Sequence, residues 1–108
     1  MSTTGKFQVE SWDEERDGQL NEHNLKKKLH DQGYSFLRYT FPSGTDFPNH
    51  THSYEKKDSI LTGQFRFAMF GQEVVLKPGD MVVVPANVVH SASVVGQDDV
   101  VFFDASKE

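Results

Sequence analysis

The sequence predicts an all-β domain, either a sandwich or a barrel, on the evidence of three observations. Short apolar runs recur along the chain, and turn signals such as Pro42-Ser43-Gly44 and Pro78-Gly79-Asp80 separate them. Nine phenylalanines and a cluster of valines in the second half favour strands. Many short strands at this spacing are typical of sandwiches and barrels. The length of 108 residues predicts one domain over residues 1–108.

The first part of the chain, about residues 6–33, is expected to hold one strand and one short helix. Apolar and polar residues alternate from Lys6 to Trp12, which predicts an edge strand. A helix is predicted through about Gln32 from an N-cap, an i, i+4 apolar pair and a C′ glycine: Asn21, Leu25 with Leu29, and Gly33. His23 and His30 lie in or near this helix among polar residues and are expected to face solvent.

The remaining strands are predicted from apolar runs between turn residues. They are expected at about residues 34–41, 56–61, 64–70, 73–76, 81–84, 88–95 and 100–103, with a loose tail at 105–108. Apolar residues stand on both parities from Tyr34 to Phe41, so this strand is expected to be buried on both faces.

Composition excludes several classes of function. A net charge of −5 argues against a general nucleic-acid binder, and the only basic run, Lys26-Lys27-Lys28, stands among acids. No apolar run approaches the roughly 20 residues that a membrane-spanning helix needs. The N-terminal residues lack the apolar core of a signal peptide, and the chain has no cysteine for disulfides or thiolate zinc sites. A cytoplasmic location is the default expectation.

Three histidines carry the strongest functional signal. His50 and His52 form an H-x-H pair in a stretch that reads as a strand, where residues i and i+2 point to the same face. His90 follows 38 residues after His52, on a predicted strand. Three imidazoles without cysteine suit a borderline divalent metal better than calcium or magnesium. The metal is therefore expected to be a transition metal, with zinc, iron, nickel, manganese and copper not distinguishable.

Two segments resemble the conserved motifs of the cupin superfamily. The first reads Gly44-x5-His50-x-His52-x3-Lys56-x6-Gly63, and the second reads Gly79-x5-Pro85-x-Asn87-x2-His90. Together the motifs occupy about residues 44–94. The resemblance implies a small single-domain (type-2) cupin, which is a jelly-roll barrel or double-stranded β-helix with a divalent metal in its mouth. Residue by residue, His50, His52 and His90 match the three histidine ligands of the family.

The first motif departs from the family at Lys56, where the family usually has an acidic ligand. One interpretation is that a β-bulge near Tyr54 turns Glu55 inward as the fourth ligand. A second, which we favour narrowly, is a metal held by three histidines and water, with Lys56 in the pocket paired to Asp58 or a bound anion. A third is that Lys56 repels the cation and the site holds no metal.

Two classes of function remain open at the level of sequence. The first is a metal-dependent enzyme acting on a small polar or acidic organic molecule, with dioxygenase-, isomerase- or lyase-like activity. In it, Lys56 and Tyr54 are the candidate catalytic residues, and Tyr54 is more simply read as a residue on the pocket rim. The second is a non-catalytic cupin module that binds or senses a small, sugar-like ligand without metal, because fold alone does not determine function.

We predict a homodimer in which Lys6 to Trp12 takes part, because an exposed edge strand needs covering and small cupins often pair through such strands. Size-exclusion chromatography with light scattering should give twice the chain mass of 12.3 kDa. A monomer at micromolar concentration would contradict this prediction.

Overall fold

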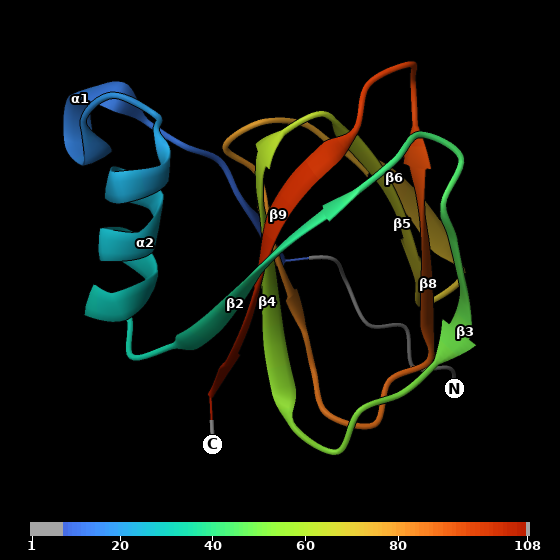
Figure 1. Ribbon diagram of the computed structural model, residues 1–108. Coiled ribbons are helices and arrows are strands. Elements are labelled where there is room, and N and C mark those ends of the chain that lie inside the picture. Colours follow the sequence, from blue (N-terminus) through green and yellow to red (C-terminus); the bar gives the residue numbers. More distant parts are fainter. Residues whose placement is uncertain (1–7, 108) are drawn as a thin grey trace.

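The computed structural model describes residues 8–107, and their strands form two antiparallel sheets (Figure 1). The first sheet has the order β1 (Gln8–Glu10), β7 (Met81–Val84), β4 (Glu55–Thr62), β9 (Val100–Lys107) and β2 (Ser35–Phe41). The second has the order β3 (Asp46–His50), β8 (His90–Val95), β5 (Gln64–Met69) and β6 (Gln72–Leu76). Two helices, α1 (Glu14–Asp17) and α2 (Glu22–Asp31), lie outside the sheets. Among the described residues, no helix is long and apolar enough to cross a membrane.

The main core lies between the two sheets, where alternate residues of each strand point inward. Its buried members are Ile60, Phe65, Phe67, Met69, Leu76, Val82, Val84, Ala92, Val94, Val100 and Phe102. Strand β5 shows the alternation clearly, because Phe65, Phe67 and Met69 are buried while the residues between them are half-buried. The period-2 pattern of the sequence therefore places one face of each sheet in a shared interior.

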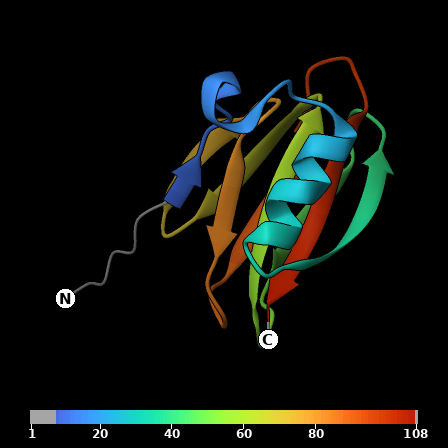
Figure 2. The ribbon, with the colours of Figure 1, turned by 90° about the vertical axis from the view of Figure 1, so that its left-hand side faces the viewer.

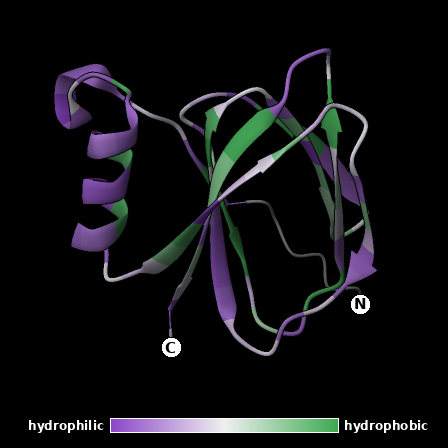
Figure 3. Ribbon diagram, viewed as in Figure 1, coloured by the Kyte–Doolittle hydropathy of each residue, from purple (hydrophilic) through white to green (hydrophobic). Residues whose placement is uncertain are grey.

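Helix α2 forms a third layer by covering the outer face of the first sheet (Figure 2). Leu25 and Leu29 are fully buried there against a second cluster that includes Phe103 and Ala105. Figure 3 shows the result as a helix with an apolar side toward the sheet and a polar side toward solvent. Burial of each leucine side chain contributes roughly 1.5–3 kcal/mol, so this apolar pair attaches the helix.

The predicted helix is confirmed, and a second helix accompanies it. The Asn21 side chain accepts a hydrogen bond from the backbone N–H of Asn24 at 2.8 Å, as expected of an N-cap. The expectation of a single helix was wrong, because the acidic run before Gly18 forms the short α1. Asp13 caps α1 by accepting from the backbone N–H of Glu15 at 3.0 Å.

Two strand predictions need correction. Strand β2 is not buried on both faces, because it lies at the edge of the first sheet and most of its residues are exposed. Residues 105–107 of the predicted loose tail instead belong to β9, which extends to Lys107 and pairs with both β2 and β4, and Glu108 lies outside the described residues. The strand predicted to end at Phe103 continues through the polar residues Asp104 and Ser106. In the structure Asp104 faces the interior, so the alternation continues. The predicted edge strand at 6–12 is β1, and Lys6 and Phe7 lie outside the described residues.

Steric constraints explain why the first motif ends in a glycine, Gly63. Gly63 joins β4 to β5 with φ of 85°, a left-handed conformation that favours glycine. A Cβ atom at this position would clash with the backbone of Asp99 and Val100. The turn therefore sets how closely β4 approaches the loop before β9.

A group of charged side chains fastens α2 to the sheet. The carboxylate of Glu10 on β1 forms ion pairs with Lys28 Nζ of α2 at 2.8 Å and with Lys57 Nζ of β4 at 2.9 Å. Lys28 also contacts Asp17 at 2.7 Å. Burial raises the pKa of Glu10, but the two lysines outweigh this effect and lower the pKa from 4.5 to about 2. One carboxylate therefore joins β1, β4 and α2.

We expect Glu10→Gln to lower the free energy of unfolding at pH 7 by about 1–2 kcal/mol, because two lysines of low exposure lose their shared anion. The depressed pKa means that the carboxylate stabilises the fold above pH 4.5, and that this contribution is lost as the pH falls toward 2. Urea unfolding across this range measures both effects.

The matched control for this experiment is Glu22→Gln, which also removes an anion shared by two cations, Lys26 at 3.0 Å and Arg38 at 3.2 Å. Both cations are exposed, so this change should alter stability little. Wild type and Glu10→Gln should converge in stability at the acid end of the series. Equal stability of the two at pH 7 would show that Glu10 does not fasten the helix.

Candidate metal centre

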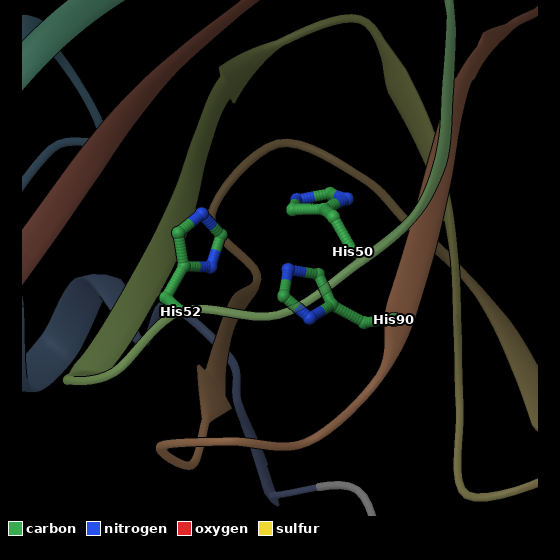
Figure 4. Close-up of side chains that lie close together, drawn as sticks. All are labelled: His50, His52 and His90. Carbon is green, nitrogen blue, oxygen red and sulfur yellow. The ribbon is translucent and has the colours of Figure 1, made fainter.

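Three histidines meet at one end of the barrel interior. His50 is the last residue of β3, His52 follows two residues later, and His90 begins β8. One ligand atom from each imidazole lies within 4.8 Å of the other two. Figure 4 shows the three rings turned toward one another. We call these three residues the histidine centre.

Strand pairing and one loop contact produce this convergence. His50 stands opposite His90 in the β3–β8 ladder, beyond an irregularity that begins at Phe47. The backbone N–H of Asn87 donates to the carbonyl of His52 at 2.7 Å, which ties the second motif to the first. Asn87 has φ of 64°, a conformation that Asn tolerates better than most residues. His52 lies past the end of β3, so its approach to His50 depends on this contact as well as on strand alternation.

Backbone carbonyls orient two of the rings. His50 Nδ1 lies 2.7 Å from the carbonyl oxygen of Pro48, and His90 Nδ1 lies 2.9 Å from that of Val88. A carbonyl oxygen only accepts, so each Nδ1 carries the proton and each Nε2 keeps a free lone pair. Such a second hydrogen bond is the usual arrangement of a metal-binding histidine.

The environment favours the neutral form of His52 and of His90. Burial lowers the pKa of His52 and of His90, and Lys56 together with the neighbouring histidines lowers both further. His52 Nδ1 is buried and has no hydrogen-bond partner among the described residues. Neutral rings with available nitrogens are the form that binds a divalent metal, so the donor set fits such an ion.

The histidine centre opens into a cavity of ≈ 290 Å³ inside the barrel. Most of the remaining wall is apolar or aromatic: Tyr39, Phe41, Phe47, Phe65, Phe67, Ala92 and Phe102. The other lining residues, Lys56, Asp58 and Asp104, are charged. We call these three the charged cluster. A mostly apolar cavity with a few polar groups is the usual form of a small-molecule site.

The charged cluster comes from two adjacent strands. Lys56 and Asp58 are two residues apart on β4, and Asp104 stands opposite Asp58 on β9. Lys56 Nζ lies 2.9 Å from Asp104 Oδ2 and 3.9 Å from Asp58 Oδ1. Burial lowers the pKa of Lys56, but the two aspartates outweigh burial and raise it. The lysine is therefore a charged residue whose charge is already neutralised within the cavity.

The structure does not bring Glu55 to the histidine centre. Its Oε2 accepts a hydrogen bond from the Tyr34 hydroxyl at 2.9 Å, on the side of the sheet that faces α2. Strand β4 keeps a regular register from Glu55 to Ile60, so no bulge turns Glu55 inward. The interpretation of Glu55 as a fourth ligand is contradicted by this placement.

The other predicted residues take different positions. Tyr54 is 44% exposed, with its ring centroid 5.6 Å from that of His52, which places it at the rim. His23 and His30 are exposed on α2, away from the centre. Asp104 is the cavity residue that sequence reasoning missed. The signal was its shared parity with Val100 and Phe102, which extends the inward face of β9.

The chain belongs to the cupin family: the family model described as a cupin domain matches residues 37–106. This range contains the histidine centre and the charged cluster. Comparison with curated proteins finds no match.

Solved structures share the fold. A predicted oxalate decarboxylase from Thermotoga maritima is 28% identical with a TM-score of 0.63, over 76% of this chain and 72% of that one. The dimethylsulfoniopropionate (DMSP) lyase DddQ from Ruegeria pomeroyi is 25% identical with a TM-score of 0.63, over 70% of this chain and 39% of that one. KdgF from Halomonas sp. is 23% identical with a TM-score of 0.61, over 70% of this chain and 71% of that one. The jelly-roll architecture expected from the motifs is confirmed.

We expect Asp104→Asn to lower the free energy of unfolding by about 1–3 kcal/mol, because the buried ammonium of Lys56 loses its nearest anion. Chemical denaturation at pH 7 measures the change. The matched control is Glu73→Gln, which removes an exposed partner of Arg66 at the same distance of 2.9 Å and should alter stability little. Equal effects of the two substitutions would show that burial does not strengthen the Lys56 pair.

Proposed function

We propose that this protein binds a divalent transition metal through His50, His52 and His90 and uses it to hold a small organic molecule in the barrel cavity. The observation that carries the proposal is the geometry of the histidine centre, with ligand atoms within 4.8 Å of one another. The two backbone carbonyls that fix the rings of His50 and His90 support it further.

A metal in this position supplies Lewis-acid polarisation of a bound oxygen. Three protein ligands leave coordination positions open to a ligand, as in catalytic sites. Around it, the aromatic walls exclude water from the body of the bound molecule, and the charged cluster presents further polar atoms to it. This arrangement supports an enzyme of dioxygenase-, isomerase- or lyase-like type. The names of the predicted oxalate decarboxylase and the DMSP lyase among similar structures agree with an enzyme.

A non-catalytic ligand-binding module is the second candidate, and one observation favours it. Lys56 occupies the position at which the family usually has an acidic ligand. Its charge is neutralised by Asp104 and Asp58, so it neither binds a metal nor is free to pair with a substrate. A cavity walled mainly by aromatic side chains can bind a small ligand without metal chemistry.

Metal analysis by inductively coupled plasma mass spectrometry on untagged protein tests the proposal. We expect about one metal ion per chain in the wild type and a loss of at least roughly tenfold in affinity for His52→Ala, because one of three ligands is gone. Lys56→Ala should retain the metal, because the lysine is paired to aspartates and offers the ion no free ligand atom.

The control variant is His30→Ala, which removes a histidine whose side chain is 84% exposed on α2. It should bind metal as the wild type does. A wild type that cannot be loaded, or metal retained in full by His52→Ala, would contradict the metal centre and favour the module. The element that is found then separates redox from Lewis-acid chemistry.

A further inference from the structure

The cavity wall indicates the shape of the molecule that it accepts. Aromatic rings face the interior in close contact, with centroids 5.0 Å apart for Phe65 and Phe102 and 5.0 Å apart for Phe41 and Phe47. Flat aromatic surfaces pack well against a planar apolar body. Apart from Tyr39, the polar side chains of the wall belong to the histidine centre and the charged cluster, so the ligand needs polar atoms mainly where these two groups face it.

The charged cluster holds one cation and two carboxylates. Lys56 Nζ is within hydrogen-bond distance of Asp104 at 2.9 Å, but its separation of 3.9 Å from Asp58 Oδ1 is too long for a hydrogen bond. Asp58 is 5% exposed, and its Oδ1 has no hydrogen-bond partner among the described residues. A buried carboxylate oxygen without a donor is costly, and a proton relieves the cost. The cavity therefore contains a group that gains from accepting a proton.

We propose that Asp58 accepts the proton of a weakly acidic ligand with a planar apolar body, when that ligand binds at the histidine centre. This inference rests on the proposed function. In the step, the O–H bond of the ligand breaks and its electron pair stays on the ligand oxygen, at the end of the cavity where His50, His52 and His90 would hold the cation. The proton forms a new O–H bond at Asp58 Oδ1. Charge is conserved, and the step needs no oxidant or further reactant.

The electrostatics of the cavity suit this role. Burial raises the pKa of Asp58 to about 7, with Lys56 opposing the rise and Asp104 adding to it. The charged or titratable groups of the cavity wall are these two neighbours, the three histidines and, from β2, Tyr39. On β7 the residue opposite Asp58 is the uncharged Val82. A carboxyl group with this pKa is ionised at pH 8 and can accept a proton, and the oxyanion of the bound ligand raises its pKa further, so that the proton stays on Asp58.

The experiment uses zinc-loaded protein at pH 8 with 4-nitrocatechol, a planar weak acid whose absorbance reports how many hydroxyls are ionised. Calorimetry in two buffers of different ionisation enthalpy counts the protons released on binding. The absorbance gives the number of protons that the probe loses, and calorimetry gives the number released to the buffer. The difference between these two numbers is the number of protons that the protein keeps. We expect about one kept proton per chain for the wild type, through linkage to Asp58.

Two isosteric variants locate the acceptor. Asp58→Asn should keep no proton, and the control Glu73→Gln, which changes an exposed carboxylate outside the cavity, should keep about one, because only the first removes the proposed acceptor. Retention of the proton by Asp58→Asn, or its loss in Glu73→Gln, would overturn the assignment. A failure of the proposed function is seen before any probe is added. In that case zinc does not bind to the wild type, or His52→Ala still binds it.

A second measurement is independent of the probe. Carbon-13 NMR of the aspartate carboxyls in zinc-loaded protein, with Asp58→Asn identifying the signal, gives the titration of Asp58 directly. A midpoint near neutral pH supports the proposal. A midpoint below about 5, close to an ordinary aspartate, overturns it even if 4-nitrocatechol does not bind.

Discussion

Strand β4 carries charge on both of its faces while it is buried on both, and this constraint organises much of the molecule. It lies in the middle of the first sheet between β7 and β9, with the barrel interior on one side and α2 on the other. Lys56 points inward and Lys57 outward, and each is less than a tenth exposed. Buried charges require partners, so each face must supply anions.

The two faces meet this requirement with different parts of the chain. On the outer face, Glu10 reaches Lys57 from β1 and Lys28 from the helix, so neutralising one strand residue also holds the N-terminal segment in place. On the inner face, Asp104 and Asp58 neutralise Lys56, and the β4–β9 register sets the two carboxylates opposite each other. The same strand therefore fastens α2 and builds the polar end of the cavity.

Much of the fold could be predicted from sequence because it depends on local signals. The N-cap at Asn21, the i, i+4 leucines and the period-2 alternation of β5 each act within a few residues. The histidine centre was also within reach, since the motif spacing identified all three of its residues. The lengths of the strands and the burial of their faces were harder to predict. The sequence window does not show that β2 lies at a sheet edge or that β9 continues past Phe103, because both depend on which strands pair.

The charged cluster shows why site chemistry escapes sequence reasoning. Lys56 and Asp58 share a strand face by spacing alone. Their relation to Asp104 is set by the pairing of β4 with β9, whose nearest ends, Thr62 and Val100, are 38 residues apart along the chain. Propensity also worked against Asp104, since a polar residue after an apolar run reads as the end of a strand. Burial and charge pairing overrode that preference.

The position of Lys56 finally bears on how a cation can occupy the proposed centre without the acidic ligand usual in the family. An unpaired ammonium in a cavity of low dielectric would raise the energy of a nearby dication steeply. Here two carboxylates lie within 4.0 Å of Nζ, at 2.9 and 3.9 Å, so the charged cluster is net negative when both are ionised and neutral when Asp58 is protonated. In neither state does it add positive charge beside the histidines. The replacement of a carboxylate ligand by lysine therefore moves negative charge from the metal-ligand position to Asp58 and Asp104, where it can respond to a proton instead of being fixed on the ion.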